Sequence, residues 1–168
     1  LPLLNPKYQS NRFIKMKRPK EFYYTNNQMV KDLIAITPIS GSILDAGSGK
    51  NKVWFNNLQG EKYECEIEDG CDFYKWDKKV DWVIGNPPFH EGWKFTEKAL
   101  QVAQKGIAFL GNINFFNQFT TKRLAIAKQA GFYLQHIHIV ADKRWFGRYY
   151  YLIFGKEDKK LISWELKT

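Results

Sequence analysis

The sequence predicts a single-domain α/β fold built on a mostly parallel sheet. The chain has 168 residues, of which 44% are hydrophobic, and can therefore bury one sizeable core. Short apolar runs alternate along it with stretches that carry a helical apolar face. Two of these runs end in loops rich in glycine or proline and in polar residues. In an open α/β sheet, such loops lie at the strand ends where ligands bind.

The N-terminal half contains one predicted helix and three predicted strands. The helix spans Asn27 to Ile36. A short buried strand from Ser42 to Ala46 leads into a glycine-rich turn, and a second strand covers Lys62 to Ile67. The third strand is the apolar run from Val80 to Gly85, which ends where two prolines cannot continue a central strand.

The C-terminal half alternates helices and strands in the same way. One helix is predicted by its apolar face and by the glycine that follows it, and a later helix by a threonine cap and a closing glycine, Gly131. In chain order the predicted elements are a helix from Glu91 to Lys105, ended by Gly106, a strand from Ile107 to Leu110, a helix from Thr121 to Ala130, and strands from Phe132 to Val140 and from Tyr149 to Phe154.

The glycine-rich turn after the first strand excludes a Walker-type phosphate loop. That loop needs a glycine where this chain has Leu44, and a serine or threonine where it has Asn51. A dinucleotide fingerprint would need a third glycine at the position of Lys52. Gly47 and Gly49 therefore allow a ligand to approach the backbone without identifying that ligand.

An acid follows this turn at the distance expected of a ribose-binding residue. Glu66 lies 19 residues after Gly47, at the end of the second strand. A carboxylate there can accept hydrogen bonds from both ribose hydroxyls. The spacing therefore favours a nucleoside cofactor.

The tetrapeptide Asn86-Pro87-Pro88-Phe89 follows the third strand directly. Asn86 offers a side-chain carbonyl and Pro87 a main-chain carbonyl, and neither proline has an N–H that could compete. Two such acceptors suit an NH2 group, and the ring of Phe89 suits a planar base. The alternative is a rigid turn of two prolines beside a core phenylalanine.

In this order, the turn residues, Glu66, Asp72-Phe73 and the tetrapeptide resemble the class I methyltransferases that use S-adenosylmethionine to methylate amino groups. The nearest group looks like the DNA adenine-N6 methyltransferases. The resemblance implies a Rossmann-like methyltransferase fold with a seven-stranded sheet and an antiparallel last strand. Only five residues separate Glu66 from Asp72, so the segment after the second strand is expected to be trimmed.

The resemblance also implies roles for the cofactor-binding residues. Tyr24-Thr25 resembles the element that holds the methionine carboxylate, and Asp45 is expected near the methionine amino group. The ribose ligand is Glu66 or Glu68, an alternative that the shortened segment leaves open. The full set of implied cofactor-binding residues is Thr25, Asp45, Gly47, Gly49, Glu66, Ile67, Asp72 and Phe73, with Ile67, Asp72 and Phe73 around the cofactor's adenine.

For the reaction, the resemblance implies that Asn86, Pro87, Pro88 and Phe89 form the catalytic loop and methylate adenine N6 in DNA. The loop contains no strong base, unless His90 acts as one rather than as a solvated loop residue. The alternatives are an RNA adenine-N6 or other exocyclic amino methyltransferase, and a catalytically silent methyltransferase-like subunit that binds nucleic acid or a catalytic partner.

The charge of the chain favours a nucleic-acid partner. Lys and Arg number 26 against 17 Asp and Glu, which gives a net charge of +9. Residues 1–20 form a basic arm, with Tyr8 and Phe13 between its cations, ahead of a methyltransferase domain over residues 21–168. The arm is either a backbone-tracking element or a solvated tail.

The connection from Ala141 to Arg148 is a second candidate for the target strand, because it combines three basic residues with Trp145 and Phe146. Its alternative is an amphipathic hairpin half in the core. No separate recognition domain fits in the chain, so target recognition would come from loops, a homodimer or a partner subunit.

The two cysteines, Cys65 and Cys71, match no metal-ligand spacing, and no metal site is expected. We expect core thiols in a reducing compartment, and hence a cytoplasmic protein. No membrane segment or signal peptide is expected either.

Overall fold

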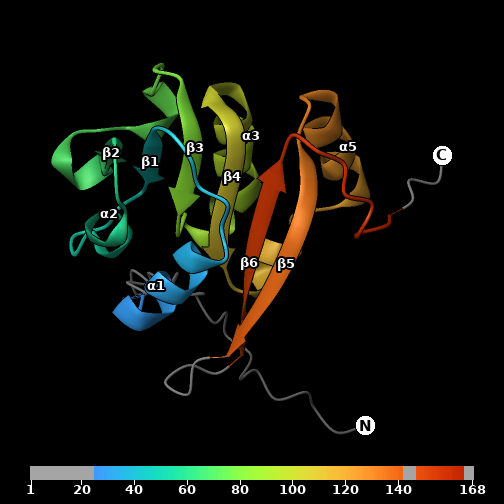
Figure 1. The fold of residues 1–168 in the computed structure, drawn as a ribbon, viewed down its shortest axis with the longest axis horizontal. Coiled ribbons are helices and arrows are strands. Elements are labelled where there is room, and N and C mark those ends of the chain that lie inside the picture. Colours follow the sequence, from blue (N-terminus) through green and yellow to red (C-terminus); the bar gives the residue numbers. More distant parts are fainter. Residues whose placement is uncertain (1–24, 142–146, 165–168) are drawn as a thin grey trace, which may run out of the picture.

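The computed structural model describes residues 25–141 and 147–164 (Figure 1). The basic arm, Tyr24 and most of the connection between Ala141 and Arg148 lie outside these residues. The helices are α1 (Asn27–Ala35), α2 (Val53–Asn57), α3 (Gly92–Val102), α4 (Ile113–Phe116) and α5 (Thr121–Gln129). The strands are β1 (Ile43–Ala46), β2 (Lys62–Cys65), β3 (Val80–Gly85), β4 (Ala103–Gly111), β5 (Tyr133–Ala141) and β6 (Arg148–Gly155).

The strands form one sheet in the order β2-β1-β3-β4-β6-β5. The pairs β1–β2, β1–β3 and β3–β4 are parallel, whereas β6 runs antiparallel to both β4 and β5. The predicted mostly parallel α/β sheet with an antiparallel last strand is therefore confirmed. β1 lies between β2 and β3, so the connection from β1 to β2 and the connection from β2 to β3 run in opposite directions across the sheet. Open α/β sheets bind ligands beside such a point, at the carboxyl ends of the strands.

The described residues form six strands, so the expected seventh is not found among them. Between β2 and β3 the chain makes only two single turns of 3-10 helix, η1 (Ile67–Asp69) and η2 (Phe73–Lys75). A crossover to a further parallel strand needs about a dozen residues or more. The trimmed segment leaves β2 at the edge of the sheet.

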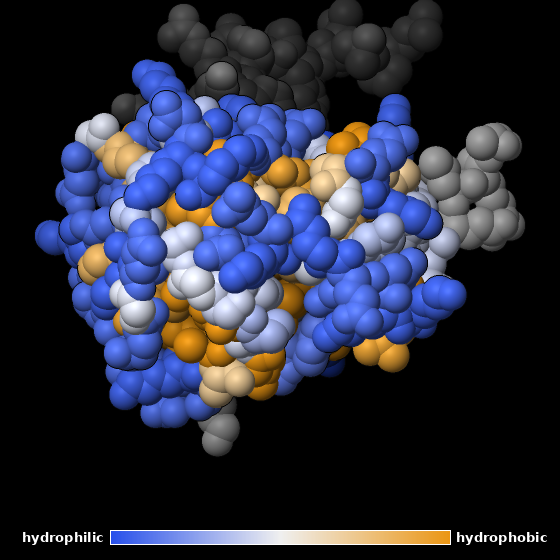
Figure 2. Space-filling model, turned by 45° about the horizontal axis from the view of Figure 1, so that its top comes forward, coloured by the Kyte–Doolittle hydropathy of each residue, from blue (hydrophilic) through white to orange (hydrophobic). Residues whose placement is uncertain are grey.

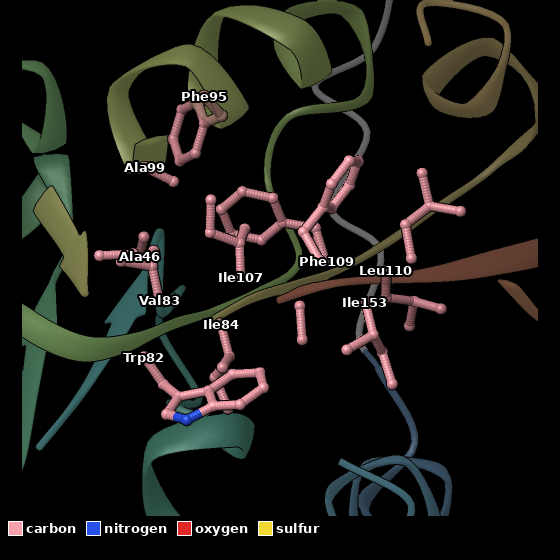
Figure 3. Packing of buried hydrophobic residues seen from close by; sticks show 14 of the residues in the cluster. Ala46, Trp82, Val83, Ile84, Phe95, Ala99, Ile107, Phe109, Leu110 and Ile153 are labelled. Atoms are coloured by element: carbon pink, nitrogen blue, oxygen red, sulfur yellow. The ribbon is translucent and has the colours of Figure 1, made fainter. Parts of the chain in front are cut away.

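Helices cover the two faces of the sheet. Tyr151 of β6 stacks on Trp54 of α2, with ring centroids 5.7 Å apart. Phe154, three residues later, points to the opposite face and contacts Phe119, which precedes α5. Figure 3 shows Phe95 of α3 on that second side of β4.

The buried centre of the sheet explains its apolar strands. All four residues of β1 are buried, as are five of the six residues of β3. A strand that is buried on both faces has continuous rather than alternating hydrophobicity. Figure 3 shows how Ile107 and Phe109 lie on one side of β4, with Trp82 on the other.

The junction between α3 and β4 differs from the prediction. The helix was expected to continue to Lys105 and to end at Gly106, but α3 ends at Val102 and β4 begins at Ala103. Pairing of Ala103 with Val80 of β3 holds the chain extended there. Gly106 is a strand residue, and its missing side chain makes room for the indole of Trp82.

The ends of the helices follow capping rules. Asn26 caps α1 by accepting from the N–H of Gln28 at 2.7 Å. The cap of α5 is Thr120 rather than the expected Thr121. Gly131 has a φ of 76° and closes α5, as predicted.

On the face seen in Figure 2, hydrophilic side chains surround smaller hydrophobic areas. Within the described ranges, the structure contains no helix with the length and apolar character needed to cross a membrane.

Replacement of Gly106 tests the packing of β4 on β3. A Cβ at this position would lie 2.3 Å from the indole carbons of Trp82. We expect Gly106→Ala to lower the free energy of unfolding by about 1 to 3 kcal/mol, because overpacking forces the ring to move. Urea denaturation measures this loss. Addition of Trp82→Phe, which removes the clashing atoms, should reduce the cost of Gly106→Ala, and equal costs in both backgrounds would contradict the packing.

Candidate functional site

A cavity of about 820 Å³ opens at the carboxyl ends of the four parallel strands β1 to β4. Each of these strands contributes the loop that follows it, so residues far apart in the sequence meet there. The predicted site residues on its wall are Thr25, Gly47, Gly49, Glu66, Ile67, Asp72, Phe73, Asn86, Pro87, Pro88 and Phe89. Of the predicted set, only Asp45 is not on the wall.

The glycine turn after β1 has the backbone conformation that its sequence suggests. Gly47 and Gly49 have φ values of 75° and 66°, in the left-handed region that glycine adopts most readily. The N–H of Gly47 donates to the carbonyl of Cys65 at 2.8 Å. A Cβ on Gly49 would meet nothing within 4 Å, so the turn borders open space on the side of the cavity.

Glu66 fastens this turn to the end of β2. Its Oε2 accepts from the N–H of Gly49 at 2.6 Å, and its Oε1 accepts from the N–H of Glu68 at 3.3 Å. A carboxylate offers about four lone-pair sites, so further acceptor capacity remains on the cavity wall. Glu68 lies on the wall too, and the choice between the two acids as ribose ligand stays open.

Asp45 lies behind the cavity. Its side chain is 0% exposed, and its Oδ2 accepts from the N–H of Phe55 in α2 at 2.9 Å. Burial raises the pKa of this carboxyl to about 7, because the charged form loses its hydration. Asp45 thus holds α2 against β1, and the structure does not bring it to the surface where a methionine amino group was expected.

An apolar wall faces the cavity beyond Glu66. Ile67 is 70% exposed, and the ring of Phe73 packs at a tilt on that of Phe95, with centroids 5.0 Å apart. Between them, Asp72 accepts from the N–H of Tyr74 at 3.0 Å through Oδ1. The wall therefore offers a flat apolar contact with a carboxylate beside it, as a planar base with an amino group would need.

Asn86 carries the most informative polar atom of the site. Its Nδ2 donates to the hydroxyl of Thr25 at 3.2 Å. Its Oδ1 is buried and has no hydrogen-bond partner among the described residues. A buried, unsatisfied carbonyl oxygen is costly, by about 1 to 3 kcal/mol, and marks a place where a donor belongs.

The rest of the loop combines a rigid backbone with an aromatic ring. Pro87 is buried and Pro88 is exposed, and both reach the cavity. Phe89 is 7% exposed and lies 6.2 Å from the ring of Tyr149, between centroids. Phe89 therefore belongs both to the hydrophobic core and to the cavity wall. The interpretation as a core phenylalanine and the interpretation as a binding residue are compatible.

The loop is tied to the apolar wall by one strong hydrogen bond. The hydroxyl of Tyr74 donates to Oε2 of Glu91 at 2.6 Å, and the ammonium of Lys94 lies 4.2 Å from the centre of the tyrosine ring. Burial and the neighbouring carboxylate raise the pKa of Tyr74. His90 is exposed and also lines the cavity.

Several residues of the cavity wall were not predicted as site residues, and Ser48, Trp54, Asn112 and Asn114 are among them. Asn112 and Asn114 follow the buried strand β4 just as Asn86 follows β3, so the same signal was present for them. Asn112 uses its Oδ1 to cap α4, accepting from Asn114 and Phe115. Ser48 and Trp54 each have a buried polar atom without a hydrogen-bond partner in the described part of the chain.

The prediction of free thiols is wrong. Cys65 and Cys71 form a disulfide that closes the loop carrying Glu66, Ile67 and Glu68. The trimmed segment explains this pairing, because it turns back at once and brings the two Cα atoms to 5.1 Å. In the described ranges no group of three or more histidine, cysteine or acidic side chains is arranged to hold a metal ion.

Comparison with known proteins identifies the fold of the chain through similar solved structures. No family model and no curated protein matches the chain. Among solved structures, it resembles magnesium protoporphyrin IX methyltransferase (ChlM) from Synechocystis PCC 6803 with bound SAH, at 12% identity, a TM-score of 0.59 and coverage of 78% of this chain and 83% of the other. It also resembles the ribosomal protein L11 methylase from Lactobacillus delbrueckii subsp. bulgaricus, at 11% identity, a TM-score of 0.57 and coverage of 79% and 77%.

A third similar structure is M. jannaschii TYW2 in complex with AdoMet, at 15% identity, a TM-score of 0.51 and coverage of 80% of this chain and 77% of the other. These proteins act on different kinds of substrate, a porphyrin and a protein among them. The chain therefore has the Rossmann-like α/β fold of methyltransferases.

The raised pKa of Asp45 predicts a pH-dependent stability. Folding raises this pKa from 3.8 to about 7, so the folded state binds a proton between these values that the unfolded state releases. The stability that this proton provides is full below pH 4 and is lost as the pH rises through 7. Asp45→Asn keeps an acceptor for Phe55 and removes the titration. We expect the variant and the wild type to unfold with similar free energies at pH 4, and the variant to be more stable by a few kcal/mol at pH 8.

Denaturant unfolding at several pH values measures this difference. Asp158→Asn is the control, because Asp158 lies on the exposed C-terminal segment. A stability difference for Asp45→Asn that does not change between pH 4 and pH 8 would contradict a neutralised, buried Asp45.

Proposed function

We propose that this chain is an S-adenosylmethionine-dependent methyltransferase that acts on an exocyclic amino group, with adenine N6 of DNA as the first candidate. The observation that carries the proposal is the buried Oδ1 of Asn86, which has no partner among the described residues and stands beside Pro87 on the cavity wall. An NH2 group is the donor that such an acceptor pair suits.

The other side of the cavity fits the cofactor. Glu66 retains acceptor capacity for ribose hydroxyls, Ile67 exposes an aliphatic surface for adenine, and Asp72 offers a carboxylate to the adenine amino group. Gly47 and Gly49 allow a close approach to the backbone. Similar folds were crystallised with SAH and with AdoMet, which supports the same cofactor class here. When bound, S-adenosylmethionine supplies an electrophilic methyl group.

The residues of the loop would act on the amine. An aromatic amine is a poor nucleophile because its lone pair is delocalised into the ring. Asn86 and Pro87 would accept its two hydrogens, favour the pyramidal form and stabilise the positive charge that develops on nitrogen. The loop therefore needs no strong base before methyl transfer, and the methylated nitrogen would lose its extra proton to solvent afterwards.

Phe89 would hold the target base by stacking. For a base in duplex DNA, extrusion costs a few kcal/mol, and stacking returns roughly 1 to 3 kcal/mol of it. The net charge of +9 supports a polyanionic substrate. Together these features support a base in nucleic acid, and DNA is preferred because the sequence most resembles enzymes of that group.

Transfer of a labelled methyl group to duplex DNA, single-stranded DNA and RNA, assayed in parallel, tests this function. We expect label in DNA, and nucleoside analysis should place it on N6 of adenine. Label confined to RNA, or placed on cytosine or guanine, would replace our choice of substrate. Failure of the chain to bind S-adenosylmethionine in calorimetry would favour a silent subunit instead.

Replacement of Asn86 tests the role of the loop. Asn86→Ala should lower the rate of methyl transfer by at least about a hundredfold, because it removes a preorganised acceptor from the amine. The Kd for S-adenosylmethionine should change little. The control is Asn117→Ala, an exposed asparagine that follows α4 outside the cavity wall. A large loss of cofactor affinity in Asn86→Ala would contradict the assigned role.

A further inference from the structure

Gln118, which follows α4, uses its whole side-chain amide to hold neighbouring backbone. Its Oε1 accepts from the N–H of Trp93 at 3.0 Å. Its Nε2 donates to the carbonyl of Asn114 at 3.0 Å and also to the carbonyl of Phe89. Both amide hydrogens and one acceptor site are therefore in use.

Two of these contacts bracket the end of the loop Asn86 to Phe89. Phe89 is the first residue of the 3-10 turn η3 (Phe89–Glu91), and the N–H of Trp93 lies in the first turn of α3. Pro87 and Pro88 make the backbone of the loop rigid, but they cannot donate the backbone hydrogen bonds that would attach it to its neighbours. Its position depends on groups outside it, and Gln118 is such a group.

Gln118 is itself held on a rigid base. Phe115 of α4 is fully buried and packs on Gly92, where a Cβ would lie 2.3 Å from the ring. Nη1 of Arg123 donates to the main-chain carbonyl of Gln118 at 2.8 Å, and the guanidinium lies 5.5 Å from the ring centre of Trp93. Apolar packing and a charged hydrogen bond thus both fix this segment against the start of α3.

We propose that Gln118 is a positioning residue for methyl transfer, which holds Phe89 in the place where it stacks on the target base. This inference rests on the proposed function. Gln118 acts through the backbone of Phe89 and is not on the cavity wall, so it would not touch the reacting atoms. The same amide fixes the carbonyl of Asn114, and so joins the wall residues after β3 to those after β4.

Gln118→Glu tests this role with almost no change of shape. The carboxylate can still accept from the N–H of Trp93, but it loses both donors and turns an oxygen toward two carbonyls. We expect kcat for methyl transfer to fall at least tenfold and the Kd for S-adenosylmethionine to stay within twofold. Gln129→Glu, with the same change of charge on an exposed residue of α5, should alter neither.

A second measurement does not depend on activity. Gln118→Leu removes all three hydrogen bonds, so amide hydrogen exchange at Trp93 should become at least tenfold faster, while exchange in β1 and β3 stays unchanged. If the wild type transfers no methyl group to any nucleic acid, the proposed function fails, and exchange at Trp93 alone then decides whether Gln118 holds this turn.

Two results would overturn the inference. The first is unchanged kcat in Gln118→Glu in a wild type that transfers methyl groups, whatever the exchange at Trp93. The second is a parallel fall of kcat, cofactor affinity and unfolding midpoint, which would make Gln118 a residue of general stability rather than of position.

Discussion

The close approach of β3 to β1 at Gly85 is the constraint on which the cavity depends. A Cβ at Gly85 would lie 2.9 Å from the carbonyl of Ala46 and from Oδ1 of Asp45. Without that side chain, the end of β3 reaches the glycine turn after β1, and Asn86 enters the same cavity as Gly47. Asp45 lies at this contact, where burial raises its pKa and the N–H of Phe55 donates to its Oδ2.

The short segment after β2 shapes the other half of the cavity. This segment turns back directly after β2. Glu66, at its start, caps the turn η1 and accepts from the N–H of Gly49, and the next residue, Ile67, stays exposed. The disulfide between Cys65 and Cys71 closes this loop. Between β2 and β3 the described chain forms no α-helix and no further strand. The segment's own hydrogen bonds and its disulfide therefore hold its residues at the cavity.

The sequence predicted those parts of the fold that local signals determine. Continuous apolar runs identified β1 and β3, and glycine and proline marked the loops that carry Gly47 and Asn86. Gly106 was wrongly predicted to end a helix. A glycine is needed there because the indole of Trp82, from the neighbouring strand β3, leaves no room for a side chain. The burial of Asp45, the cysteine pairing and the contacts of Gln118 likewise depend on tertiary neighbours, which periodicity and spacing do not reveal.

The two sides of the cavity form one mechanical unit. The hydrogen bond from Tyr74 to Glu91 joins the apolar wall to the last residue of η3, and Gln118 joins Phe89, the first residue of η3, to Asn114 of α4. Movement of either wall would therefore displace Phe89. On the proposed function, a cofactor that packs on Ile67 and Phe73 would also restrict the movement of the loop that binds the amine. The cofactor side and the substrate side of the cavity are connected by the same hydrogen bonds.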